Sequence, residues 1–237
     1  MSSSHFDLIA GDYDGSLPAH VVEHYLRKRT AFVLRHCPRG RALEVGIGTG
    51  RLAARLAQAG YEMVGVDPSE GMLERARARA PGVRTVRGSG TALPFADGSF
   101  DLVLTVAVMH HIADASDVRG ALFEMVRVAR PGGQVLVWDH NARNPYWGHL
   151  MARVPQDTGD ERLIPEAELL DGLRAAGTDI LLSAQLGLVP DFTPRPLLAA
   201  AAVAERIVER TPLVRGLCAH NVILGAKPRE RRPARPV

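Results

Sequence analysis

The chain has 237 residues, of which 46% are hydrophobic and 23% are charged, a composition typical of a globular domain and not of a disordered or fibrous chain. Its apolar runs are shorter than the roughly 20 residues that cross a bilayer, and the N-terminus lacks a basic segment followed by an apolar one, so a secreted or transmembrane protein is not expected. We predict a cytoplasmic protein in which Cys37 and Cys218 are free thiols, because two cysteines exclude a disulfide framework and a multi-cysteine zinc site.

The net charge of +3 arises in the C-terminal segment. Residues 226–237 contain five Lys and Arg residues and one Glu, which give a local charge of +4 and leave −1 for the other 225 residues. This Pro- and Arg-rich composition predicts a disordered basic tail at 227–237 and not a nucleic-acid groove. Nucleic acid is therefore not an expected partner, while weak attraction of the tail to anionic lipid or RNA is left open.

Short apolar runs alternate with helical patterns along the chain, a rhythm typical of β-α units that build a buried parallel sheet. The first strands are predicted at 41–45, 61–66, 83–87, 100–106 and 134–138, with helices at 49–59, 69–80 and 118–129. Helices at 165–176 and 197–209 and strands at 179–184 and 221–225 follow. The seven strands predict a doubly wound, Rossmann-like α/β fold.

Two regions do not follow this rhythm, the N-terminal residues 1–36 and an insertion at 186–217. Material added to the open edge of an α/β sheet usually covers the ligand crevice. We therefore expect helical lids at both places, around a main domain at 37–226. The amphipathic helix of the insertion packs against the core in one interpretation. In another, Arg206 and Arg210 flank an apolar stripe that lines a substrate pocket or touches a membrane surface.

A glycine-rich loop, EVGIGTG at 44–50, follows the first strand and opens the first helix. Glycines at alternate positions let the backbone turn tightly and approach a ligand. The loop contains a carboxylate, Glu44, and no lysine, so it would repel a pyrophosphate. Asp67, at the end of the second strand, can accept hydrogen bonds from both hydroxyls of a ribose. An adenosine with a cationic, phosphate-free end fits both acids, and S-adenosylmethionine is such a molecule; a dinucleotide fold that binds NAD is the alternative.

The region from 43 to 139 resembles the class I S-adenosylmethionine-dependent methyltransferases, in the branch that includes the ubiquinone and menaquinone C-methyltransferases and many natural-product methyltransferases. The matching stretches are LEVGIGTGRLA (43–53), GVDPSEGML (65–73), ALPFADGSFDLVL (92–104), HHI (110–112) and RPGGQVLV (130–137). The resemblance implies a mostly parallel sheet whose last strand is antiparallel, with S-adenosylmethionine as cofactor.

The resemblance also implies roles for individual residues. Glu44 and the first two loop glycines would line the methionine end of the cofactor, Asp67 would hold the ribose, and Met72 would flank the adenine. Relatives commonly carry an acid in the loop before LPF, where this chain has Ser89, whose hydroxyl accepts a hydrogen bond more weakly than a carboxylate. The predicted cofactor-binding set is Glu44, Gly46, Gly48, Asp67, Met72, Ser89, Gly90 and Thr91.

Three histidines follow neighbouring strands at the edge where the acceptor would bind. A general base is needed only where the acceptor carries a proton at neutral pH, and histidine suits that task. We predict His111 and His140 as catalytic residues, with His140 oriented by Asp139, and loop-capping structural histidines as the alternative. Asp139 and Asn141 lack a further carboxylate partner for magnesium, so no metal is predicted.

Five side chains are predicted to form the acceptor wall and the lid: Tyr13, Tyr25, His110, Tyr146 and Trp147. Ordinary N-terminal packing is the alternative for Tyr13, and a solvated helix face is the alternative for Tyr25.

We predict methyl transfer from S-adenosylmethionine to a small or lipid-like organic acceptor, at oxygen, in specialised metabolism. One alternative is C- or N-methylation of a quinone-like or natural-product acceptor. Another is a non-catalytic S-adenosylmethionine-binding or assembly protein. A homodimer is left open.

Overall fold

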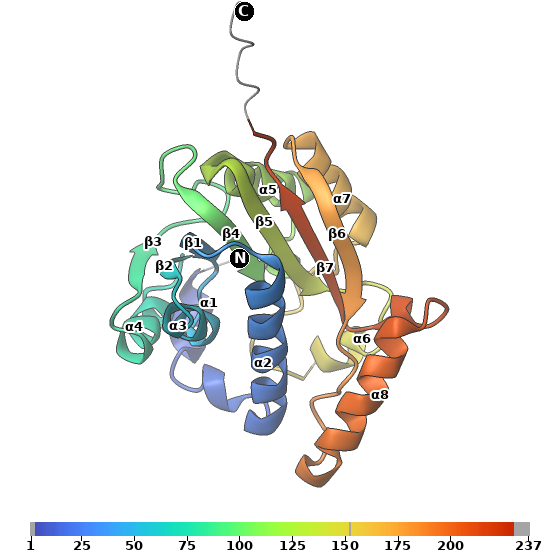
Figure 1. Ribbon diagram of the computed structural model, residues 1–237. Helices are drawn as coiled ribbons and strands as arrows, with labels where there is room; N and C mark the ends of the chain where they lie inside the picture. Colours follow the sequence, from blue (N-terminus) through green and yellow to red (C-terminus); the bar gives the residue numbers. More distant parts are fainter. Residues whose placement is uncertain (1–2, 152, 230–237) are drawn as a thin grey trace, which may run out of the picture.

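A seven-stranded sheet forms the centre of the computed structural model, which describes residues 3–151 and 153–229 (Figure 1). The strands are β1 (Arg41–Val45), β2 (Glu62–Asp67), β3 (Arg84–Arg87), β4 (Phe100–Val106), β5 (Ala129–His140), β6 (Asp179–Leu186) and β7 (His220–Ala226). Their order across the sheet is β3-β2-β1-β4-β5-β7-β6. The first five strands pair in parallel, and β7 is antiparallel to both of its neighbours. The predicted doubly wound sheet with an antiparallel last strand is confirmed.

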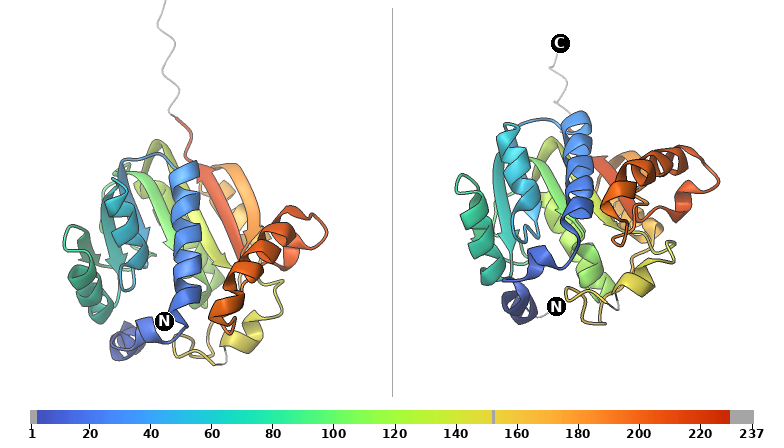
Figure 2. Two further views of the ribbon diagram at one scale, coloured as in Figure 1. Left: turned by 60° about the horizontal axis from the view of Figure 1, so that its bottom comes forward. Right: turned by 90° about the horizontal axis from the view of Figure 1, so that it is seen from below.

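Helices cover both faces of the sheet, as the views in Figure 2 make plain. α2 (Ala19–His36) and α3 (Arg51–Gln58) pack on one face. α5 (Ala115–Val128) and α7 (Glu166–Ala175) pack on the other, while α4 (Glu70–Arg79) lies against β2 and β3. This two-sided cover explains why the central strands β1, β2 and β4 are buried along most of their length.

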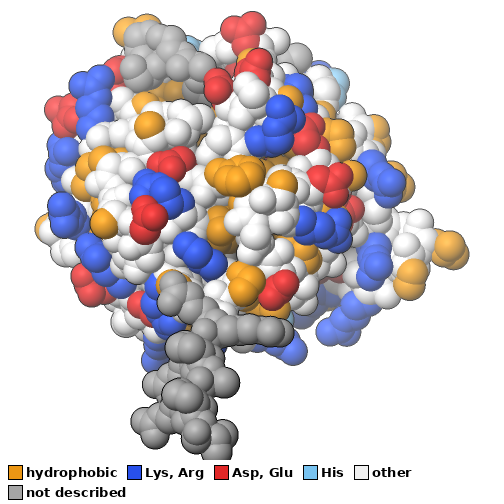
Figure 3. Space-filling view, turned by 90° about the horizontal axis from the view of Figure 1, so that it is seen from above, with side chains coloured by type: hydrophobic (Ala, Val, Ile, Leu, Met, Phe, Trp, Pro, Cys, Tyr) orange, Lys and Arg blue, Asp and Glu red, His pale blue; other side chains and the backbone are white. Residues whose placement is uncertain are grey.

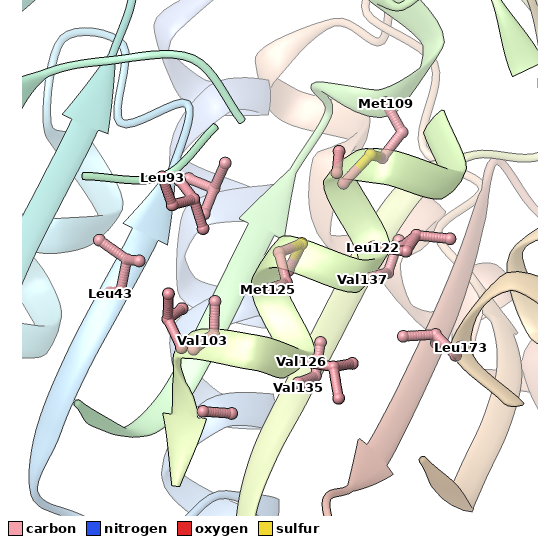
Figure 4. Packing of buried hydrophobic residues seen from close by; sticks show 14 of the residues in the cluster. Leu43, Leu93, Val103, Met109, Leu122, Met125, Val126, Val135, Val137 and Leu173 are labelled. Carbon is pink, nitrogen blue, oxygen red and sulfur yellow. The ribbon is translucent and has the colours of Figure 1, made fainter. Parts of the chain in front are cut away.

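Alternation along the strands divides the core into two clusters. Val135 and Val137 of β5 face α5 and α7, where they pack with residues such as Leu122 (Figure 4). Leu136 and Trp138 of the same strand face α2 and α3. Because neighbouring side chains of a strand point to opposite faces, β1 places Leu43 toward α5 and the next residue, Glu44, toward α2.

The main difference from the predicted elements is the length of β5, which begins five residues earlier than the predicted strand at 134–138. The Pro-Gly-Gly segment indicates a turn, but Gly132, with φ of +76°, continues the pairing by donating its N–H to the Lys227 carbonyl at 2.8 Å. The Lys227 ammonium in turn donates to three carbonyls at the end of α5. The folded part therefore includes Lys227, the first residue of the predicted tail. Residues 230–237 of that tail lie outside the described residues.

Short helical segments surround the edge of the sheet at which the parallel strands end, the lower edge in Figure 1. They are α1 (Ser3–Ile9), η1 (Tyr13–Gly15), η2 (Met109–His111), α6 (Trp147–Met151), η3 (Arg195–Leu197), α8 (Leu198–Arg210) and η4 (Arg215–Leu217). On the opposite edge, basic and acidic side chains are interspersed (Figure 3). Within 3–151 and 153–229, no helix combines the length and the apolar character needed to cross a membrane. The lid roles of 1–36 and 186–217 stay predictions.

Candidate active site

A cavity of about 910 Å³ lies beyond the carboxyl ends of the parallel strands. The loops after β1 to β5 line it, together with the N-terminal segment and the segment after β6. The structure brings to this cavity every residue that the sequence predicted for the site: Tyr13, Tyr25, Glu44, Gly46, Gly48, Asp67, Met72, Ser89, Gly90, Thr91, His110, His111, His140, Tyr146 and Trp147. Their contacts define what the cavity can bind.

Two glycines of the glycine loop, Gly46 and Gly48, have different structural roles. Gly46 has φ of +76°, and a Cβ atom there would lie 2.4 Å from a methyl group of Val108. Gly48 has φ of +51°, but nothing lies within 4 Å of its missing Cβ. Gly46 is therefore required by packing between the loops after β1 and β4. Gly48 leaves backbone accessible to a ligand.

Asp67 ties the end of β2 to the glycine loop. One carboxylate oxygen accepts from the N–H of Gly48 at 2.9 Å, and the other accepts from the N–H of Ser69 at 3.0 Å. Burial raises the pKa of this carboxyl above its usual range, against the effect of the two hydrogen bonds. Each carboxylate oxygen keeps a second lone pair, so the side chain can still accept hydrogen bonds from a diol in the cavity.

Glu44 and Arg29 each hold a buried polar atom at the cavity that has no hydrogen-bond partner among the described residues. Glu44 is 4% exposed, and its Oε2 has no hydrogen-bond partner among the described residues. Burial raises the pKa of its carboxyl to about 8, although Arg29 acts in the opposite direction. The Arg29 Nε is also buried without a partner in the described chain, and the guanidinium lies 5.8 Å from the Tyr25 ring centre. Buried groups of this kind are costly until a ligand satisfies them.

The predicted site did not include Arg29, although it lies on the same helix as Tyr25. Its spacing from Tyr25 was the available signal, because residues four apart share one face of a helix. Both side chains line the cavity.

The loop that was predicted to contact adenine is stabilised by hydrogen bonds of its own hydroxyl groups. Ser89 Oγ lies 2.9 Å from Thr91 Oγ1 and accepts from the N–H of Thr91 at 3.2 Å. The neighbouring Met72 is 1% exposed and lies behind the loop in the cavity wall. The turn is thus held in shape by the residues that replace the relatives' acid.

The N-terminal segment is fixed over the glycine loop by Asp14. This carboxylate accepts from Thr49 Oγ1 at 2.8 Å and from Arg51 Nε at 2.9 Å, and it also pairs with Arg79. The ion pairs hold the pKa of Asp14 below its usual range, against the effect of partial burial. They place the neighbouring Tyr13 in the cavity, where burial raises its pKa to about 12.

A second carboxylate of this segment holds the start of α4. Asp7 accepts from Ser69 Oγ at 2.6 Å and from the N–H of Gly71 at 2.9 Å. Ser69 in turn caps α4 by accepting from the N–H of Met72. A carboxylate at a helix N-terminus is stabilising, so this contact attaches the N-terminal segment to the start of α4.

His110, and not His140, is the histidine that Asp139 orients. His110 Nδ1 lies 2.7 Å from Asp139 Oδ1, and both side chains are buried. The other oxygen of Asp139 accepts from the N–H groups of Val108 and Met109 at 3.0 and 2.7 Å. Burial acts against ionisation of Asp139, but His110 and these hydrogen bonds hold its pKa below the usual range.

The predicted pairing of His140 with Asp139 is therefore wrong. Adjacent residues of a strand point to opposite faces. Asp139 therefore accepts a hydrogen bond from the backbone N–H of His140, at 2.7 Å, and not from its ring. The His140 ring stacks between Trp147, at 3.6 Å, and His110, at 3.8 Å. Burial moves the pKa of His140 well below its usual value.

His111 lies on the other side of His110, at a ring distance of 4.0 Å. Its Nδ1 is 3.9 Å from a carboxylate oxygen of Asp157 and 3.7 Å from one of Glu161. Burial and the neighbouring His110 lower the pKa of His111 to about 3, so the ring is neutral at pH 7. No sequence signal pointed to Asp157, which lies 46 positions farther along the chain and also lines the cavity.

Among the described residues, two sets of side chains have ligand atoms close enough together to hold a metal ion. They are His110, His111 and Asp157, and His110, Asp139 and His140, with the atoms of each set within 4.8 Å of one another. Both sets need His110, whose Nδ1 already bonds Asp139. That the site works without a metal stays a prediction.

Aromatic side chains connect the far wall of the cavity to the insertion. The Tyr146 hydroxyl donates to Asp191, and its ring packs 5.8 Å from that of Phe192. The Tyr25 hydroxyl donates to the carbonyl of Val189 at 2.8 Å. The segment after β6 is thereby attached both to α2 and to the loop after β5.

Comparison with known proteins identifies similar chains. Residues 43–137 match the family model described as "Methyltransferase domain". A demethylmenaquinone methyltransferase of Beutenbergia cavernae is 35% identical over 149 residues, which cover 62% of this chain and 60% of the relative. The enzyme of the same name from Renibacterium salmoninarum is 37% identical over 158 residues, covering 63% and 65%. The chain thus spans less than two thirds of the length of either relative.

A solved structure is similar over nearly the whole chain. It is an S-adenosylmethionine-dependent methyltransferase of Thermotoga maritima, described as a "possible histamine N-methyltransferase". The sequence identity is 26%, the TM-score is 0.72, and the match covers 95% of this chain and 100% of the other.

Proposed function

We propose that the chain transfers a methyl group from S-adenosylmethionine to a hydroxyl group of a bulky, largely apolar organic acceptor. The match of residues 43–137 to the methyltransferase family model and the similarity to an S-adenosylmethionine-dependent methyltransferase structure support this donor. The observation that carries this proposal is the His110–Asp139 pair at 2.7 Å in the cavity wall. A hydroxyl must lose its proton during methylation, and this pair would supply a base at the cavity wall.

The unpartnered atoms of Glu44 and Arg29 support one orientation of the cofactor. S-adenosylmethionine has an ammonium and a carboxylate at its methionine end. Glu44 would accept from the ammonium, and Arg29 would pair with the carboxylate, so that both orphaned groups become satisfied. Asp67 would hold the ribose diol. The ligand that fits this end is thus zwitterionic, and not only cationic.

His110 would act as the base, and Asp139 as its positioning residue. In the neutral ring, Nδ1–H donates to Asp139 and Nε2 keeps a lone pair. Nε2 takes the proton of the acceptor hydroxyl as the oxygen attacks the methyl carbon, and the C–S bond breaks to leave S-adenosylhomocysteine. The carboxylate of Asp139 stabilises the imidazolium that forms.

The size and lining of the cavity support an acceptor larger than a simple metabolite. Away from the glycine loop, the wall consists mainly of apolar side chains: Leu17, Val21, Val22, Ile112, Leu150, Val154, Leu188, Val189 and Leu217. Specific ligand sites are typically apolar with a few polar groups. An aromatic acceptor with an aliphatic extension fits such a wall.

A second candidate is C-methylation of a quinone-like acceptor. It is favoured by the similarity to two proteins named demethylmenaquinone methyltransferase. A reduced quinone also carries a hydroxyl whose deprotonation makes the adjacent ring carbon nucleophilic. The same base serves both reactions, so product analysis must separate them.

The test is turnover of S-adenosylmethionine carrying a labelled methyl group, with naphthols, catechols and reduced naphthoquinones as acceptors. The proposal expects the label on oxygen, located by NMR of the product. Label on a ring carbon would favour the second candidate. Absence of both turnover and cofactor binding would favour a non-catalytic assembly protein.

Cofactor binding is tested separately with Asp67→Ala. Loss of the ribose contacts is expected to weaken the affinity for S-adenosylhomocysteine at least about tenfold in titration calorimetry. Asp171→Ala is the matched control, because that carboxylate is 77% exposed on α7. Equal affinities of the two variants would remove Asp67 from the ribose site.

A further inference from the structure

The helix α8 turns a charged side chain toward the protein and large apolar side chains toward solvent. Its buried residue is the charged Glu205, which is 1% exposed, while Val203 and Ile207 on the outer side are 49% and 62% exposed. Glu205 accepts from His24 and pairs with Lys28 of α2. A helix of a globular protein normally turns its apolar side toward the core.

The exposed apolar side chains continue beyond both ends of the helix. We call the set the α8 surface: Phe192, Leu197, Val203, Ile207, Leu213 and Leu217. The exposed fractions of those outside the helix are 70%, 57%, 96% and 51% for Phe192, Leu197, Leu213 and Leu217. Figure 2 shows α8 and the segment after it standing out from the body of the molecule. A gathering of large apolar side chains at such a place marks an interaction surface.

The charge of this surface is positive. Arg195, Arg206, Arg210 and Arg215 are all exposed, and none of them forms an ion pair within the described part of the chain. The acids of residues 192–217 are Glu205 and Glu209, and both pair with Lys28 on the inner side. The surface therefore presents apolar groups and uncompensated cations together.

The α8 surface reaches the cavity. Leu217 is half exposed and also lines the cavity wall. Phe192 packs against Tyr146, whose other side lines the cavity. A molecule held at this surface would thus lie beside Tyr146 and Leu217 of the cavity wall.

We propose that the α8 surface docks on an anionic lipid bilayer. Its apolar side chains would enter the boundary between headgroups and acyl chains, and the four arginines would lie at the lipid phosphates, where each cation contributes to binding. Docking turns this part of the cavity wall toward the membrane, so that an acceptor dissolved in the bilayer reaches it without crossing water. The proposal concerns lipid binding and does not depend on which atom is methylated.

The test is flotation of the full chain with vesicles, without cofactor or acceptor. Vesicles of phosphatidylcholine alone are compared with vesicles containing about one third phosphatidylglycerol. We expect binding to the anionic vesicles only, weakened at high salt, and reduced at least about tenfold in Arg206→Glu/Arg210→Glu. The matched control is Arg84→Glu/Arg119→Glu, which makes the same charge change at exposed positions elsewhere and is expected to bind normally.

The apolar contribution is tested with Ile207→Ser. It should weaken vesicle binding, whereas Leu181→Ser, at a position 55% exposed on β6, should not. Absence of vesicle binding, or equal binding by both charge-reversal variants, would overturn the proposal. So would self-association of the chain that Ile207→Ser abolishes, because α8 would then contact a second copy. Methyltransferase activity in vesicle-free solution should be unchanged in the charge-reversal variants, which separates this proposal from the proposed reaction.

Discussion

The two sides of the cavity are built in different ways. The cofactor side consists of three loops that directly follow β1, β2 and β3, all within residues 44–91. The acceptor side is assembled from segments far apart in the sequence, at 6–26, 106–121, 140–157 and 188–220. Arg29 of α2 is the residue from outside the three loops that we assign to the cofactor. One side is thus encoded in local motifs, while the other exists only after the chain has folded.

The two sides also differ in charge. The cofactor side contains an orphaned carboxylate atom on Glu44, and the orphaned Nε of Arg29 lies in the same cavity. The acceptor side contains His111 and His140, which burial keeps neutral. The two unpartnered atoms are the reason for the proposed zwitterionic ligand on the cofactor side.

The largest expected effect lies on the acceptor side. His110→Ala removes the proposed base and should lower kcat by about 10²–10⁴-fold at pH 7. Affinity for S-adenosylhomocysteine should change little, because the proposed cofactor contacts are in other loops. His111→Ala is the matched control, since its ring lies in the same stack without bonding Asp139. A kcat reduced equally in both variants would contradict a specific role for the His110–Asp139 pair.

The next effect concerns the backbone of the cofactor side. Gly46→Ala and Gly48→Ala impose the same type of positive-φ strain, but only the first places a Cβ atom 2.4 Å from Val108. We expect thermal unfolding without cofactor to show a loss of about 2–4 kcal/mol for Gly46→Ala and about 1 kcal/mol for Gly48→Ala. Equal losses would mean that strain alone, and not packing against the loop after β4, requires the glycine.

A smaller effect is expected in the pH dependence of cofactor affinity. Burial raises the pKa of Glu44 to about 8 in the unliganded protein, and the proposed contact with the ammonium needs the ionised form. Affinity should therefore rise between pH 6 and 8, by at most about tenfold per pH unit, and level off above. Calorimetry with S-adenosylhomocysteine measures this slope, and a Glu44→Gln variant with the wild-type slope would contradict the assignment.

The same carboxyl has an opposite effect on folding. In the unfolded chain Glu44 ionises near its ordinary pKa of 4.5, whereas the folded chain holds the proton up to about pH 8. The folded state therefore binds more protons in this window, so stability falls as the pH rises from about 4.5 to 8. Glu44→Gln should remove this fall in chemical denaturation of the unliganded protein.

The cofactor side could be located from the sequence because its features are local. A strand that ends in glycines and a second strand that ends in Asp67 need only the order of residues. The sheet topology followed from the alternation of apolar strands and helices in the same way. The contacts between the loops could not be predicted. The packing of Gly46 on Val108, for example, joins residues 62 positions apart in the sequence.

The contacts of the acceptor side could not be predicted without the folded structure. The sequence placed His110, His111 and His140 at one edge, but the partner of Asp139 depends on which face of β5 each side chain occupies. Asp157 and Arg29 carry no motif, and their position in the cavity results from packing of segments that no local pattern relates. Glu205 is a further case, since this buried charge in a helix is explained by its pairing with Lys28 and His24 of another helix.

The smallest effect tests the connection between the two sides, the N-terminal segment. Asp14 joins this segment to the glycine loop through partly exposed pairs with Arg51 and Arg79, and such pairs contribute about 0.2–1 kcal/mol each. Asp14→Ala should therefore speed release of S-adenosylhomocysteine about two- to fivefold in stopped-flow measurements. Asp97→Ala is the control, because it removes an ion pair to Arg127 away from the cavity. If both variants release the ligand at the wild-type rate, the segment is part of the wall and not a lid, and the cofactor side retains its ligand through its loops alone.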